Sequence, residues 1–267
     1  MKPDLLATVL VAVLLSAGGW AARALTGRAA LAATIIGWAI LRGAGWPGAA
    51  VLGAFFILSS ALGRFVGLLG PRSTGDLTGD AKGERRDARQ VLANGGFAAL
   101  GAALTAGEPG LAIWVVTGSL AAAGADTWAT AIGGLSRTAP RLLLAGRRVP
   151  PGTSGGMTLL GTAGAVAGSG VVSAAGALSG SNPHLAIWGT MIGVAGMALD
   201  SILGATLQGR FHCPACEVES EWRVHRCGSR TTHTGGLAWL TNDGVNALAT
   251  AAGALAGWLA WRCCSPP

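Results

Sequence analysis

Residues 111–134 read LAIWVVTGSLAAAGADTWATAIGG, an apolar run that carries one charged residue, Asp126, in 24 positions. A helix that crosses the hydrocarbon core of a membrane needs about 20 mostly apolar residues. The run therefore predicts a transmembrane helix. Hydrophobicity does not explain the acid inside it, and Asp126 is the first candidate functional residue.

The composition of the whole chain extends this prediction. Of 267 residues, 51% are hydrophobic and only 12% are charged, and the mean hydropathy is +0.52, whereas a soluble domain carries about 25% charged residues. The 44 glycines suit membrane helices that pack closely through small residues. The sequence predicts an all-α, polytopic integral membrane helix bundle with the lipid bilayer as its surroundings.

Apolar stretches between turn signals predict about eight spans. Three of the breaks read GWPG at 45–48, EPG at 108–110 and SNP at 181–183, and all contain helix-breaking residues. The expected spans are 5–22, 29–45, 48–69, 92–106, 111–134, 156–179, 185–207 and 236–261. We divide the chain into N-terminal helices at 1–70, a core at 71–261 with a Cys/His loop at 209–235, and a tail at 262–267.

Basic residues gather in three connections, which explains the net charge of +7 without nucleic-acid binding. Two expected spans separate each basic connection from the next, so all three fall on one side of a multi-pass cell-membrane protein, and the positive-inside rule makes that side cytoplasmic. Both termini then face outward. The basic residues are Arg64, Arg72, Lys82, Arg85, Arg86 and Arg89, then Arg137, Arg141, Arg147 and Arg148, and finally Arg210, Arg223, Arg226 and Arg230.

Three aspartates lie inside or at the edge of apolar segments: Asp126, Asp200 and Asp243. A carboxylate at the centre of a membrane costs at least about 2.5–3.5 kcal/mol to insert, so each is a candidate functional residue. Alternatively, each caps a helix or pairs with a loop arginine. Asn242 and Asn246 accompany Asp243 at helical spacing, and oxygen ligands from several helices suit Mg²⁺ bound with a polyphosphate.

Two segments offer donors for phosphate. Arg148 precedes a stretch that we interpret as an anion-binding turn leading into a helix, formed by Gly152, Thr153, Ser154, Gly155 and Gly156. On a helix, Arg86, Gln90 and Asn94 share one face that runs from a basic connection into the membrane. The alternative for this face is a helix end that binds lipid headgroups. Acids for a metal and donors for phosphate together indicate phosphoryl transfer.

The Cys/His loop carries a Cys-x₂-Cys pair and a His-x-Cys pair. Cys213, Cys216, His225 and Cys227 suit tetrahedral Zn²⁺, with His212 or His233 as substitute ligands. A redox pair and a loop without metal are the alternatives. Cys263 and Cys264 in the tail are expected to be free or lipid-modified.

Six ordered motifs between about residue 80 and residue 250 resemble one membrane-protein family. The motifs are RDARQVLANGG at 86–96, ADTWAT at 125–130, PRL at 140–142, VPPGTSGG at 149–156, DSILGA at 200–205 and NDGVN at 242–246. They resemble the transmembrane protein nineteen family, long classed as a domain of unknown function. That family includes a phytyl-phosphate kinase of plants and cyanobacteria and is similar to CTP-dependent dolichol and phytol kinases.

The resemblance implies an isoprenyl monophosphate kinase that uses CTP or ATP and forms the lipid diphosphate. It implies that Asp126, Asp200 and Asp243 hold Mg²⁺ and phosphates. One position departs from the family, which usually carries an acid shortly after the Asp-Thr-Trp element, where this chain has Ala131. The rival hypothesis is a transporter or flippase of a phosphorylated lipid that uses no nucleotide. The length of the lipid, the nucleotide and the oligomeric state stay open.

Overall fold

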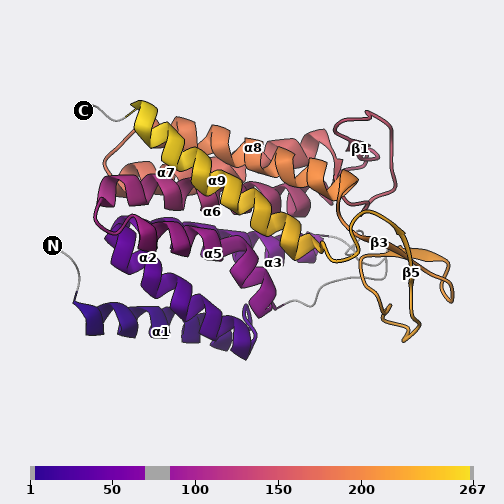
Figure 1. The fold of residues 1–267 in the computed structure, drawn as a ribbon, viewed down its shortest axis with the longest axis horizontal. Helices are drawn as coiled ribbons and strands as arrows, with labels where there is room; N and C mark the ends of the chain where they lie inside the picture. The colour runs from indigo at the N-terminus through magenta and orange to yellow at the C-terminus, as the bar shows by residue number, and fades with distance from the viewer. Residues whose placement is uncertain (1–3, 70–84, 265–267) are drawn as a thin grey trace.

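The computed structural model describes residues 4–69 and 85–264 and confirms an all-α bundle (Figure 1). Arg72 and Lys82 of the first basic connection and the last residues of the tail, 265–267, lie outside the described ranges. The helices are α1 (Leu5–Ala21), α2 (Gly27–Gly53), the π-helical η1 (Ala54–Leu58), α3 (Ser59–Leu69), α5 (Ala88–Leu104), α6 (Pro109–Gly133), α7 (Leu159–Ser179), α8 (His184–Thr206) and α9 (Asn242–Cys264).

Short strands lie between the helices. β1 (Arg141–Leu142) pairs with β2 (Gly156–Met157), and β3 (Arg210–Cys213) lies between β4 (Val218–Ser220) and β5 (Thr232–Gly235), all antiparallel. Two span boundaries were therefore wrong. Residues 156–157 belong to β2 and not to a helix, and residues 236–241 connect β5 to α9. Both segments consist of residues that are apolar or small, so composition alone includes them in a span. Their backbones instead form hydrogen bonds with neighbouring segments.

The break predicted at residues 45–48 lies inside α2. Gly45 has φ of 64° and ψ of −156°, and Pro47 follows. A Cβ atom on Gly48 would lie 2.8 Å from Ile40 Cγ2, although eight residues of straight helix span about 12 Å. The chain therefore turns back on itself here, and residues on the two sides of Gly45 pack against each other.

The predicted count of eight spans is not confirmed. Four described segments are long and apolar enough to cross a membrane, namely Gly27–Leu69, Pro109–Gly133, Leu159–Ser179 and His184–Thr206, and Leu5–Ala21 is apolar but shorter. The first of these segments contains the turn at Gly45, so it includes two of the expected spans, 29–45 and 48–69. The exact number of crossings stays a prediction.

Helix α6 is the centre of the bundle, and every residue from Leu111 to Ala125 is buried. Its neighbours approach it backbone to backbone through glycine. A Cβ atom on Gly168 of α7 would lie 2.6 Å from Gly124 O, and one on Gly193 of α8 would lie 2.8 Å from Ala121 O. Because α6 is enclosed, it is hydrophobic on all sides and does not show a single apolar stripe.

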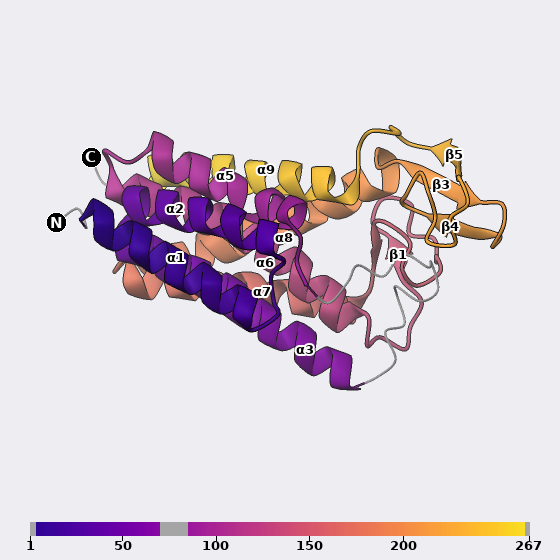
Figure 2. The ribbon, with the colours of Figure 1, turned by 90° about the horizontal axis from the view of Figure 1, so that it is seen from below.

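The two ends of the bundle differ in their chemistry. In Figures 1 and 2, α1 begins and α9 ends at one end, and the strands β1 to β5 lie at the other. The strand-bearing end contains the two fully described basic connections, α6 to α7 and α8 to α9. The described arginines of these connections therefore share one end, as predicted. Which side of the membrane this end faces stays a prediction.

We expect Gly118→Ala to destabilise the bundle, because a Cβ atom there would lie 2.3 Å from Gly253 O of α9. Overpacking of this kind typically costs about 1–3 kcal/mol. The control is Gly63→Ala in α3, whose Cβ would meet nothing within 4 Å. The midpoint of thermal unfolding in detergent should fall by several degrees for Gly118→Ala only. Equal midpoints for the two variants would show that close approach of α6 and α9 is not required.

Candidate functional site

The register of α8 on α6 brings Asp200 to the level of Asp126. Two contacts, four residues apart on each helix, define this register. A Cβ atom on Gly189 would meet Thr117 Cγ2 at 3.2 Å, and one on Gly193 would meet Ala121 O at 2.8 Å. Continuing this pairing for two turns places Asp200 beside the turn that follows Asp126. Consistent with this placement, a Cβ atom on Gly196, one turn before Asp200, would lie 2.5 Å from Ala122 Cβ, one turn before Asp126.

Helix α9 packs against α6 in the opposite direction. Cβ atoms on Gly257 and Gly253 would lie 2.4 Å from Trp114 O and 2.5 Å from Gly118 O, respectively. The same register, continued toward the start of α9, places the turns that carry Asn242, Asp243 and Asn246 beside Asp126. The structure thus gathers the three predicted acids at one level of the bundle, near its strand-bearing end. Their role as metal ligands stays a prediction.

Two oxygen atoms at this level are buried without a hydrogen-bond partner among the described residues: Asp200 Oδ2 and Asn246 Oδ1. Asp200 is only 9% exposed. Buried polar atoms are nearly always paired, and an exception calls for an ion, a water molecule or a functional role. Oxygen atoms of a carboxylate and an amide are the ligands that Mg²⁺ prefers. The residues present therefore fit a divalent cation.

The predicted anion-binding turn lies against α8, close to Asp200. Gly155 has φ of 76°, and a Cβ atom there would lie 2.3 Å from Ser201 O, so a larger residue is excluded by both conformation and space. The sequence analysis expected this turn to lead directly into a helix, and that expectation was wrong. β2 follows it, and α7 begins only at Leu159 with Thr158 as its N-cap.

The hydroxyl groups of this turn donate hydrogen bonds within the protein. Thr153 Oγ1 donates to Pro150 O at 2.8 Å, and Ser154 Oγ donates to Glu221 Oε1 at 2.9 Å. Anion binding by the turn would thus use backbone groups or rearranged hydroxyls. Phosphate binding by residues 152–156 stays a prediction.

Glu221 lies beside the glycine turn, and the sequence analysis missed it. Its Oε1 atom also accepts a hydrogen bond of 2.8 Å from Gln208 Nε2. Gln208 is 2% exposed and follows Asp200 and Gly204 at steps of four residues. A buried glutamine at the end of a polar stripe needs a hydrogen-bond partner. This need was the signal in the sequence that could have pointed to Glu221.

Arg86 lies just before α5 and does not share a helical face with Gln90. Its backbone bridges to Leu25, and its guanidinium lies 5.2 Å from the Phe55 ring centroid and 5.5 Å from that of Phe56. Burial lowers the pKa of Arg86 to about 10, so the group stays charged at neutral pH. The expected face was wrong because Gln90 folds back to cap the helix with Asp87.

The other predicted phosphate-binding residues have different surroundings. Asn94 is half-buried on α5, which is joined to α9 by a hydrogen bond of 2.8 Å from Thr250 Oγ1 to Ala93 O. Arg148 is exposed at the strand-bearing end, where its backbone bridges to Arg141. Arg148 therefore offers an accessible cation, and Asn94 faces a more enclosed region.

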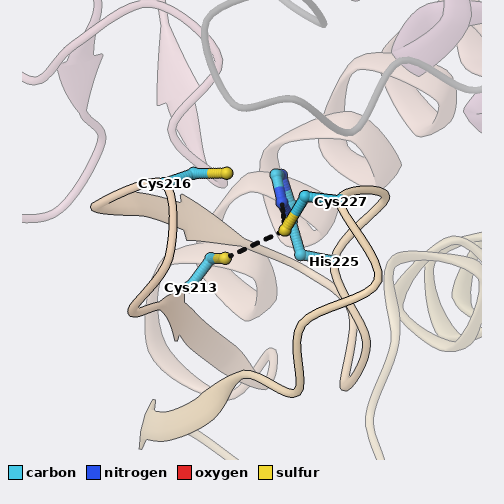
Figure 3. A group of neighbouring side chains, drawn as sticks. All are labelled: Cys213, Cys216, His225 and Cys227. Atoms are coloured by element: carbon cyan, nitrogen blue, oxygen red, sulfur yellow. Dashed lines mark hydrogen bonds between the residues drawn. The ribbon is translucent and has the colours of Figure 1, made fainter.

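The four predicted cysteine and histidine ligands come together in the loop between α8 and α9 (Figure 3). The ligand atoms of Cys213, Cys216, His225 and Cys227 all lie within 4.8 Å of one another, so the cluster could hold a metal ion. Cys213 Sγ lies 3.6 Å from Cys227 Sγ, and His225 Nδ1 lies 3.2 Å from the same sulfur. Tetrahedral sites with Zn–S bonds of about 2.3 Å have similar separations between their ligands.

The thiol groups of this cluster interact strongly. Hydrogen bonding with His225 lowers the pKa of Cys227 to about 6, which makes this thiol largely ionised at neutral pH. Hydrogen bonding with Cys227 raises the pKa of Cys216 to about 11. Without a metal ion, the cluster thus holds one thiolate that accepts hydrogen bonds from its neighbours. A bound metal ion would displace the remaining thiol protons, because cysteine ligands bind as thiolates.

Fold and site together define a polytopic α-helical membrane protein with three acids, of which Asp200 is buried, near one end of its bundle. The chain belongs to the family described as integral membrane protein DUF92, whose model matches residues 10–254. This confirms the family resemblance seen in the sequence motifs.

Two curated relatives are similar to parts of the chain. The membrane protein MJ0933 of Methanocaldococcus jannaschii is 34% identical over 123 residues, which cover 46% of this chain and 52% of that protein. Protein PGR of Arabidopsis thaliana is 31% identical over 143 residues, which cover 49% of this chain and 48% of PGR. The chain thus spans about half the length of these relatives. No solved structure shows a significant match to the chain.

We expect the purified protein to retain about one metal ion per chain at the Cys/His cluster, because four ligands preform a site. Cys213→Ser combined with Cys227→Ser should remove this ion. The matched control is Cys263→Ser combined with Cys264→Ser at the end of α9. Elemental analysis after gel filtration measures the metal, and a monodisperse peak shows that the bundle is intact. Equal metal content in both variants would contradict the assignment of the cluster.

Proposed function

We propose that the protein is an integral-membrane kinase that transfers a phosphoryl group from CTP or ATP to an isoprenyl monophosphate, such as phytyl or geranylgeranyl phosphate. One observation supports the proposal most directly. Asp200 Oδ2 is buried and unpaired among the described residues, and Gly155 of the glycine turn packs against Ser201, the residue after Asp200. An acid suited to a cation thus lies beside a turn suited to phosphate.

The chemistry of this reaction suits a site without a strong nucleophile. An oxygen of the lipid monophosphate is already anionic at neutral pH and attacks the γ-phosphorus of the nucleotide. The bond from that phosphorus to the bridging oxygen breaks, and the nucleoside diphosphate leaves. Such transfers depend on positioning and on neutralisation of charge, which are the functions that acids with Mg²⁺ and basic groups supply.

Each group of residues has a proposed role. Asp126, Asp200 and Asp243 would hold Mg²⁺, which neutralises phosphate charge when it is bound. The phosphates and the nucleotide would be bound by Arg86, Asn94, Arg148, the turn at residues 152–156, Asn242 and Asn246. The lipid tail would stay between the helices, and the strand-bearing end would face the cytoplasm, where nucleotide is available.

For the Cys/His cluster we propose zinc as the metal. Three thiolates and one imidazole form a closed tetrahedral set, which is the usual composition of structural zinc sites. The loop has few buried side chains of its own, chiefly Phe211, Cys213, Ser220 and His225. A bound ion would therefore supply much of the energy that folds it.

The test is an assay with purified protein in lipid nanodiscs, phytyl or geranylgeranyl phosphate, Mg²⁺ and CTP or ATP labelled in the γ-phosphate. We expect label to enter a lipid diphosphate. Asp126→Asn and Asp200→Asn should each lower the rate at least 100-fold, because each removes a charge that holds the cation. Glu108→Gln, at an exposed acid that precedes the first residue of α6, should keep the rate of the native protein.

Two outcomes would overturn the proposal. One is full activity in Asp126→Asn and Asp200→Asn. The other is the absence of labelled lipid with every nucleotide and lipid, together with movement of a phosphorylated lipid across the membrane without nucleotide consumption. The second result would establish the transporter or flippase.

A further inference from the structure

Glu221 is held in place by two elements that are distant in the sequence. Its Oε1 atom accepts hydrogen bonds from Ser154 Oγ of the glycine turn at 2.9 Å and from Gln208 Nε2 at the end of α8 at 2.8 Å. Gln208 Nε2 also donates to Ser154 Oγ at 3.2 Å. This closed triangle fixes the carboxylate group, and a carboxylate has further lone pairs that can bind a cation.

Glu221 is held close to the buried Asp200. Ser154, which donates to Glu221, precedes Gly155, and a Cβ atom on Gly155 would lie against Ser201 O, one residue after Asp200. Asp200 is almost fully buried with its Oδ2 atom unpaired among the described residues. A divalent cation bound there would satisfy this oxygen, and carboxylates are among its preferred ligands.

We propose that Glu221 is a further carboxylate of the cation site formed by Asp126 and Asp200, and that the metal bound at the Cys/His cluster keeps Glu221 there. This inference rests on the cation site of the proposed function.

The connection from the Cys/His cluster to Glu221 is short. Cys213 ends β3 and is paired with Val218 of β4, while Phe211 is paired with Ser220. Glu221 follows Ser220 directly. A metal ion that joins Cys213 to Cys227 therefore fixes the strand pair that presents Glu221. Loss of the ion should loosen β3 and β4 and release the carboxylate from the site.

The experiment measures Mn²⁺ affinity of the full chain in nanodiscs, without nucleotide or lipid substrate, by the loss of the free Mn²⁺ signal in electron paramagnetic resonance. Glu221→Gln should weaken binding at least tenfold. The substituted amide keeps an oxygen that can accept from Ser154 and Gln208, so the fold should be preserved. Glu219→Gln, an exposed acid of β4, is the matched control and should bind Mn²⁺ as the native protein does.

A double-mutant cycle tests the role of the Cys/His cluster. Cys213→Ser combined with Cys227→Ser should weaken Mn²⁺ binding by a factor close to that of Glu221→Gln. In the Glu221→Gln background the same two substitutions should have little further effect, because the group they position is already neutral. Independent, multiplying effects would overturn the proposed coupling between the cluster and Glu221.

The outcomes distinguish this inference from the kinase proposal. If Asp200→Asn weakens Mn²⁺ binding and Glu221→Gln does not, the role of Glu221 is overturned and the kinase proposal stands. If Glu221→Gln weakens binding and no lipid is phosphorylated in the labelled-nucleotide assay, the cation site stands and the kinase proposal fails. If neither substitution changes Mn²⁺ binding, the cation site itself is overturned.

Discussion

Close approach of helix backbones around α6 is the constraint on which the structure depends. α7, α8 and α9 contact α6 where glycine leaves no side chain between the helices, as at Gly168, Gly193 and Gly257. Such contacts allow little sliding, because a shift of one residue would press a Cβ atom into a neighbouring carbonyl group. The glycines therefore fix the register of three helices against the same central helix.

That register gives the acids their arrangement. Asp126, Asp200 and Asp243 are far apart in the sequence, yet their helices bring them to one level near the strand-bearing end. The glycine turn at residues 152–156 and the Cys/His loop lie at this end of the bundle. Hydrogen bonds among Ser154, Gln208 and Glu221 connect the turn to the loop. Helix packing thus places the three acids, and the loops add the polar groups that would meet phosphate and solution.

Much of this was predictable from the sequence, and the exceptions have physical reasons. Apolar runs and helix breakers indicated the bundle, and the spacing of Cys213, Cys216, His225 and Cys227 predicted their cluster. Glu221 was missed because its contacts cross the fold: the polar stripe that ends at Gln208 indicated a need for a partner but did not say which residue it was. Arg86 was placed on a helical face because periodicity ignores the capping box of Asp87 and Gln90. With Asp87 as the N-cap, the helix begins at Ala88, two residues after Arg86.

We propose above that acids from α6 and α8 hold one divalent cation between them. The most direct measurement is the position of Mn²⁺ in crystals of the protein, located by anomalous scattering. We expect a peak within coordination distance of carboxylate oxygens of both Asp126 and Asp200. A well-occupied Mn²⁺ peak at any other place, with none between these two residues, would contradict it.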